Sequence, residues 1–449
     1  MPIQPHNVTS MLNRKSGWVW SLLRAAHGPH CFAHSELDPP VGAKDREIRG
    51  ETILHQAKAK KQNLIELTDW RSDMNFKGLM LAAAAATAAT GASAADLPVA
   101  PEPVDYVKVC DAYGARFFYI PGTDTCLRVG GRVRAQVNSG NFADRDDANR
   151  DGFSAHADDG IDMNAEGYLY LDSRTSTEFG LLRTYTEIEV ESDNDVSLGK
   201  AFIQWGGVTA GHATSFFDFF TGQVFVGSVG RNWSDATTNL FAYTAAFGNG
   251  FSATISLEDG RVRESGDYGG TRYPDLVANL RVDQGWGSAQ LSGAVHHVNP
   301  ADVTAKGDTG WAVGGGVIIN LPMLSSASNI AFQAQYADGA LSYIGAPNST
   351  ADYDATGGTT KTNKGYALSA GIYHEIGNIG LALDGSYADV DVANNGNDVS
   401  RWAVDGSVQW EPVSGLQLGV DMGYANTDID NTTGDLDEWK AGFRMQRTF

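Results

Sequence analysis

Apolar and polar side chains alternate along most of the chain after residue 125, in segments of about ten residues. In CLRVGGRVRAQV, Val129, Val133 and Val137 fall on one face of an extended chain, and the arginines fall on the other. The pattern recurs in GLLRTYTEIEV, PDLVANLRVD, SAQLSGAVH, NIAFQAQYA and RWAVDGSVQW. A period of two over such lengths indicates β-strands, because successive side chains of a strand point to opposite faces.

The alternation predicts sixteen strands, joined by connectors of two kinds. Short turns, such as Gly248-Asn249-Gly250 and Gln284 to Gly287, alternate with long acidic loops rich in Gly and Asn. This asymmetry is typical of an up-and-down barrel in a membrane. The predicted strands are 126–137, 166–175, 180–191, 199–205, 207–213, 239–247, 250–258, 274–283, 287–297, 310–320, 328–337, 365–374, 379–388, 400–411, 415–425 and 436–449.

The polar face of these strands carries Arg and Glu at repeated positions, too many for a packed interior. In a sixteen-stranded barrel such a face lines a water-filled lumen, and the apolar face meets lipid. Aromatic residues at strand ends agree with belts at the two membrane interfaces: Trp205, Trp286, Trp402, Trp410, Tyr424 and Trp439. We therefore expect an all-β fold, a sixteen-stranded antiparallel transmembrane β-barrel over residues 126–449.

The N-terminal region does not share this pattern. MNFKGLMLAAAAATAATGASA has a basic residue, a short apolar run and small residues before a cleavage site between Ala94 and Ala95, the order of a secretory signal peptide. It starts only at Met74, so we expect 1–73 to be an over-extended start that is not in the product, and 74–94 to be removed. A buried alanine-rich helix is the alternative interpretation. Residues 95–125 then form a short N-terminal segment.

Composition narrows the classes of partner. Residues 1–94 hold 11 of the 33 Lys and Arg residues and 8 of the 54 Asp and Glu residues, so 95–449 keep 22 basic and 46 acidic residues and a net charge of −24. This charge argues against nucleic acid as a partner. Two cysteines, Cys110 and Cys126, lie in the expected mature chain, and export favours a disulfide between them over two free thiols.

The end of the chain carries a candidate assembly signal. In EWKAGFRMQRTF, Phe443, Met445 and the terminal Phe449 share one face with Trp439 and Ala441. A final strand that ends on Phe resembles the signal that barrel-insertion machinery reads in outer-membrane proteins.

Several long blocks resemble, in order, the general porin family of alphaproteobacteria. They are YVKVCDAYGARFFYIPGTDTCLRVGGRVRAQV, LDSRTSTEFGLLRTYTEIE, AFIQWGGVTAGHATSFFDF and PDLVANLRVDQGWGSAQLSGAVHHV. The resemblance covers essentially all of 95–449. It implies a homotrimer in the cell outer membrane that passes small hydrophilic solutes and ions by diffusion, with loop 3 folded into the barrel. The family lacks an extension like 1–73, and so supports a start at Met74.

The resemblance places loop 3 at Ser215 to Asn239, SFFDFFTGQVFVGSVGRNWSDATTN. Its many apolar residues independently favour packing against the barrel wall. Asp218 and Asp235 are then candidate acids at the narrowest point, with Glu187 and Glu189 on the wall. The candidates for an opposing basic wall are Arg128, Arg132, Arg134, Arg183 and Arg281. Alternatively, several of these arginines pair with wall carboxylates such as Glu187 and Glu189. The acidic loops favour weak cation preference.

Other motifs in the sequence give weaker indications of function. Asp147, Asn149, Asp151 and Asp158 match the spacing of a calcium loop, but no helix flanks them, and a solvated acidic loop is the simpler interpretation. A His/Cys cluster at HGPHCFAH lies before Met74. No nucleophile, phosphate-binding or dinucleotide motif is present, so we expect neither an enzyme nor a cofactor. A barrel enzyme or a plugged structural barrel remains the alternative function.

Overall fold

The computed structural model describes residues 108–140, 160–193, 195–347, 350–355, 358–394, 396–431 and 435–449. The predicted signal peptide with its Ala94/Ala95 cleavage site, the extension 1–73 and the candidate calcium loop lie outside the described residues. Among the helices of the described part, none is long and apolar enough to cross a membrane.

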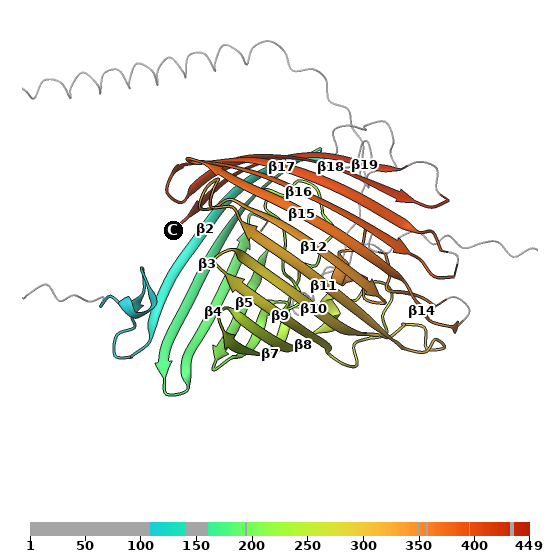
Figure 1. Cartoon of the computed structure of the whole chain (residues 1–449), viewed down its shortest axis with the longest axis horizontal. Helices are drawn as coiled ribbons and strands as arrows, with labels where there is room; N and C mark the ends of the chain where they lie inside the picture. The colour runs from blue at the N-terminus through green and yellow to red at the C-terminus, as the bar shows by residue number, and fades with distance from the viewer. Residues whose placement is uncertain are drawn as a thin grey trace, which may run out of the picture. The chain divides into compact units, whose positions relative to one another are not determined.

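Sixteen antiparallel strands close into one barrel (Figure 1), as the sequence predicts. Each strand pairs with the next along the chain, and β19 pairs with β2, from Gly442 opposite Asn138 to Thr448 opposite Arg132. The barrel strands are β2 (Cys126–Ser139), β3 (Ile161–Thr177), β4 (Gly180–Glu191), β5 (Val196–Trp205), β6 (Val208–Thr214), β7 (Thr237–Gly248), β8 (Phe251–Glu258), β9 (Asp275–Gln284), β10 (Gly287–Val298), β11 (Asp308–Asn320), β12 (Asn329–Asp338), β15 (Lys364–Ile376), β16 (Ile379–Asp391), β17 (Val399–Val413), β18 (Leu416–Ile429) and β19 (Leu436–Thr448).

Every predicted strand overlaps one barrel strand, but some strands are longer than predicted. β3 starts at Ile161, five residues before the predicted start, because Asp162 and Asn164 pair in register with Asn138 and Gln136 of β2. Because these residues are polar, the sequence pattern does not indicate a strand here. A water-filled lumen allows polar side chains at positions where a packed core would not.

Short turns join the strands at one end of the barrel, and the longer loops lie at the other. At the turn between β7 and β8, Asn249 and Gly250 have positive φ angles of 51° and 79°, as the Asn-Gly pair of a tight hairpin requires. The described residues also form short elements besides the sixteen barrel strands: the 3₁₀ helices η1 (Asp111–Tyr113), η2 (Gly260–Val262) and η3 (Leu341–Ile344), the strand β1 (Phe118–Tyr119), which pairs with the start of β2, and the pair β13 (Tyr353–Asp354) and β14 (Lys361–Thr362).

The outer face of the barrel is apolar. Large side chains such as Phe241, Leu280 and Leu291 are exposed there, which suits contact with lipid rather than water. Exposed tryptophans lie towards both ends of the strands, Trp205 and Trp286 at the turn end and Trp311 at the loop end. The last residue extends the closing ladder: Gly131 and Phe449 exchange two backbone hydrogen bonds, of 3.1 and 3.0 Å. Phe443 and Met445 are also exposed on β19.

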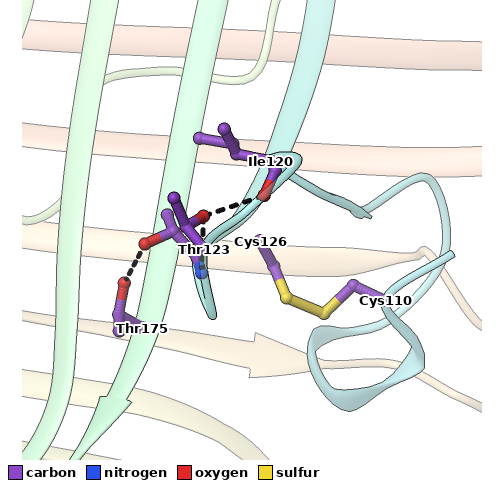
Figure 2. The surroundings of a disulfide bond; sticks show 6 residues. Cys110, Ile120, Thr123, Cys126 and Thr175 are labelled. Carbon is purple, nitrogen blue, oxygen red and sulfur yellow. Dashed lines mark hydrogen bonds between the residues drawn. A yellow bond between two sulfur atoms is a disulfide. The ribbon is translucent and has the colours of Figure 1, made fainter. Parts of the chain in front are cut away.

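A disulfide confirms the predicted Cys110–Cys126 pair and closes a small N-terminal knob, residues 108–126 (Figure 2). The two Cα atoms are 6.0 Å apart, and Cys126 is the first residue of β2. Phe117 is a buried residue of the knob, and the centroid of its ring lies 5.2 and 4.9 Å from the guanidinium carbons of Arg128 and Arg174. The knob is therefore seated on side chains of the inner wall.

Candidate functional site

Loop 3, residues 215–236 between β6 and β7, folds into the barrel and lies against its inner wall. Glutamine side chains of the wall hold its backbone: Phe220 N donates to Gln333 Oε1 at 3.1 Å, and Ser234 N donates to Gln335 Oε1 at 3.3 Å. Near its start, Phe216 N donates to Glu258 Oε1 at 3.0 Å. The apolar composition of the loop is therefore explained by its position inside the barrel.

Three aspartates on consecutive strands hold the tip of the loop, and we call them the aspartate ladder: Asp384 of β16, Asp405 of β17 and Asp421 of β18. Asp384 and Asp405 face each other in register, and Asp421 lies opposite Ser407, two residues further along β17. The side chains of Asp384 and Asp405 are wholly buried, and that of Asp421 is nearly so.

Each aspartate accepts hydrogen bonds from backbone N–H groups of loop 3. Asp384 Oδ2 accepts from Gln223 at 2.6 Å and Val224 at 3.0 Å. Asp421 Oδ2 accepts from Val226 and Gly227 at 2.7 and 3.0 Å, and Asp405 Oδ2 from Val229 at 3.3 Å. Arg231 of the loop also pairs with Asp405 at 2.7 Å. Hydrogen bonds to a charged acceptor are stronger than neutral ones, so the ladder fixes the path of the loop.

Wall glycines make room for the phenylalanines of the loop. A Cβ atom added at Gly316, Gly371 or Gly419 would lie 2.5 Å from the ring of Phe219, Phe220 or Phe225 respectively. Real Cβ contacts are not that short, so a larger residue at these positions would push the loop away from the wall.

At the root of the loop, Asp218 forms a buried ion pair with Arg263, at 2.9 Å and with both side chains 2% exposed. Asp218 also accepts from Ala236 N at 2.7 Å. The prediction that Asp218 lies at the narrowest point of the channel is therefore wrong: its charge is neutralised inside the protein. Asp235, the other predicted acid of the loop, is exposed.

Two outer loops are latched to the same end of the barrel. Asp352 of the loop 339–363 accepts from Tyr268 Oη, in the loop 259–274, at 2.8 Å and from Leu341 N at 2.6 Å. Burial raises the pKa of the Asp352 carboxyl. The Tyr268 hydroxyl also lies 3.1 Å from His296 Nε2, and His296 Nδ1 lies 2.8 Å from Asp275 Oδ1 on the wall.

The wall formed by β2, β3 and β4 carries four of the five predicted arginines and no hydrogen bond to loop 3 within the described residues. The fifth, Arg281, lies on β9, with its guanidinium carbon 5.4 Å from the centroid of the Phe219 ring of loop 3. Arg128, Arg174 and Arg183 converge on Asp172, at 3.4, 2.9 and 3.0 Å. The Asp172 side chain is 1% exposed. Arg134 pairs with Glu166 at 3.0 Å.

The sequence left open that several of these arginines pair with acids of the wall. They do form such pairs, but their partners are not Glu187 and Glu189. Glu187 accepts from Tyr185 Oη at 3.1 Å. Arg281 pairs with Asp283 of its own strand at 2.8 Å. Asp172, Glu166 and the aspartate ladder were missed from the sequence. An acid repeated on the polar face of three consecutive strands was the available signal for the ladder.

Several of these inward side chains remain in contact with water. The exposed fraction is 40% for the Arg128 side chain, 36% for Arg281 and 54% for Asp283. Inner positions of a filled barrel would be buried, so the lumen is open to solvent where these side chains lie. Within the described ranges, no group of three or more His, Cys, Asp or Glu side chains is placed to hold a metal ion.

Comparisons with known proteins agree with this architecture. A family model described as "Porin subfamily" matches residues 96–446. Porin Omp2b of Brucella suis biovar 1 (strain 1330) is 41% identical over 243 residues, 48% of this chain and 64% of the relative. Porin Omp2b of Brucella melitensis biotype 1 (strain 16M) matches with the same identity and coverage. The chain thus spans slightly less than two thirds of the length of these relatives.

Among solved structures, the outer membrane channel DcaP of Acinetobacter baumannii is similar, with a TM-score of 0.63 and 18% identity. The match covers 74% of this chain and 99% of that channel. At this identity it supports the fold alone. The barrel, its apolar outer face and the family match together locate the protein in the cell outer membrane. The chain belongs to the porin subfamily.

Proposed function

We propose that this protein is a general diffusion porin, a passive water-filled channel for small hydrophilic solutes and ions. The observation that carries the proposal is that loop 3 occupies only part of the barrel interior. Loop 3 is held against one part of the wall, while charged side chains on the wall of β2, β3 and β4, such as Arg128, stay partly in water. A fixed loop that narrows but does not fill a charged lumen is what size and charge filtering require.

The electrostatics of the lumen support weak cation preference. Asp172 and Glu166 neutralise much of the basic wall, so the acidic loops dominate the field at the mouth. We also propose that the protein is a homotrimer whose subunits meet through apolar outer faces of the strands nearest the termini. The terminal Phe449 would be read by the barrel-insertion machinery during assembly.

Single-channel recording in a planar bilayer tests the proposal. The purified outer-membrane form is added under a KCl gradient, and its conductance and reversal potential are measured. A porin trimer would insert in steps that close in thirds, with a reversal potential of cation sign. A silent bilayer with protein that migrates as a folded barrel before heating would contradict a diffusion channel.

A further inference from the structure

One row of inward side chains crosses the wall opposite loop 3. Arg132 of β2 lies in register with Tyr168 of β3, and Tyr168 lies in register with Glu189 of β4. We call these three residues the dipolar row. It places a cation and an anion on either side of one aromatic ring, about 10 Å apart at the backbone, since neighbouring strands are spaced about 4.8 Å.

Within the described ranges, the cation of this row forms no ion pair. Arg132 lies over the Tyr168 ring, with 3.8 Å between the guanidinium carbon and the ring centroid. Among the described residues it has no ion-pair partner, whereas Arg128, Arg134 and Arg183 each have one. Arg132 Nε is buried with no hydrogen-bond partner in the described structure, so only the two terminal nitrogens of the guanidinium are left to meet a solute.

The anion at the other end is also without a cation in the described part of the chain. Across β4, Glu189 faces Ser197 of β5, whereas Lys200 faces Glu187 one row away. The hydroxyl of Tyr168 donates to Glu166. Each charged residue of the dipolar row also has like-charged neighbours on the same face of its own strand. Arg134 lies beside Arg132 on β2, and Glu187 and Glu191 lie beside Glu189 on β4.

We propose that the dipolar row binds small zwitterionic solutes, such as free amino acids, with the carboxylate at Arg132 and the ammonium at Glu189. A simple ion is attracted at one end of the row and repelled at the other, so it gains little binding free energy. A solute that carries both charges satisfies both ends with charge-assisted hydrogen bonds. This inference rests on the proposed channel function and adds a solute class to it.

Swelling of proteoliposomes tests the proposal, with alanine as the zwitterion and lactamide as a neutral solute of similar size. Alanine enters the unmodified channel about twofold to fivefold faster than lactamide, the gain expected of one partly exposed ion pair. Arg132→Gln and Glu189→Gln each bring the ratio close to one, without slowing lactamide. The double substitution is no worse than either alone, because each charge acts only with the other.

Two controls keep the outcome decisive. Arg272→Gln and Glu178→Gln make the same charge changes at exposed positions outside the lumen and leave the ratio unchanged. Reversal potentials in KCl move in opposite directions for Arg132→Gln and Glu189→Gln, which a loss of folding would not produce. An equal rate for alanine and lactamide in the unmodified, conducting channel overturns the dipolar row alone, whereas a loss of conductance in the unmodified protein overturns the channel itself.

Discussion

At the scale of single residues, the lumen is organised by carboxylates that the sequence does not single out. The arginines were predicted from their repetition on one face of β2, and the structure places them on the inner wall. Their partners could not be predicted, because Asp172 lies on the next strand and Arg183 on the one after it. The prediction for Asp218 was wrong for the same reason: Arg263, which neutralises it, is 45 residues away in the chain.

Asp172→Asn should unbalance the wall. Removing one charge leaves Arg128, Arg174 and Arg183 without their shared acceptor, so the reversal potential in a KCl gradient shifts towards anions. Asp283→Asn is the matched control, because its pair with Arg281 is exposed and worth little. A shift of equal size in both variants would show that Asp172 has no special role.

The Asp218–Arg263 pair gives a prediction for stability. Asp218→Asn leaves a buried guanidinium uncompensated and should cost about 3–5 kcal/mol. Asp218→Asn combined with Arg263→Met should recover part of this loss, since the stranded charge is then absent. The urea concentration that unfolds the barrel, followed by electrophoretic mobility of unheated samples, measures both. No loss in the single variant would mean that water reaches the pair.

At the scale of elements, strands were predictable and the loop path was not. Alternation predicted all sixteen strands because each one has lipid on one side and the lumen on the other. The apolar content of loop 3 indicated that it packs inside. Its contacts depend on Asp384, Asp405 and Asp421, which come from strands 160 or more residues later in the chain.

Gly419→Val should displace loop 3. The new side chain would meet the Phe225 ring, which lies only 2.5 Å from the place that a Cβ atom would take at this glycine, so the loop tip moves away from β18 into the lumen. We expect smaller single-channel conductance with more open-channel noise. Gly406→Ala on the neighbouring strand is the control, since its Cβ would have ordinary contacts of 3.6 Å or more. Unchanged conductance in Gly419→Val would refute this role of the glycine.

At the scale of the whole molecule, closure of the barrel pairs its last strand, β19, with its first strand, β2. The length of the strand series predicted a closed barrel, but the register of β19 on β2 is a property of the folded structure. That register ends in the backbone pair of Gly131 and Phe449. A sequence pattern alone cannot give such a register, because it contains no information on the shear of the barrel.

Deletion of Phe449 should reduce assembly more than it reduces stability. Two of the many hydrogen bonds between β19 and β2 are lost, so purified protein refolded in detergent should still form the barrel. In cells, the amount of heat-modifiable barrel in the outer membrane should fall severalfold if insertion machinery reads the terminal ring. Thr448→Ala, at an exposed neighbouring position, is the control. An equal loss in refolding and in cells would assign the effect to closure of the sheet.

The aspartate ladder has a consequence for how this channel can change over generations. Apart from the pair of Asp405 with Arg231, its carboxylates bind backbone N–H groups, which every residue except proline possesses, rather than particular side chains. The wall therefore dictates where loop 3 runs while leaving the chemistry of its water-facing positions open to variation. New filters can arise there by single substitutions, and the barrel keeps its fold.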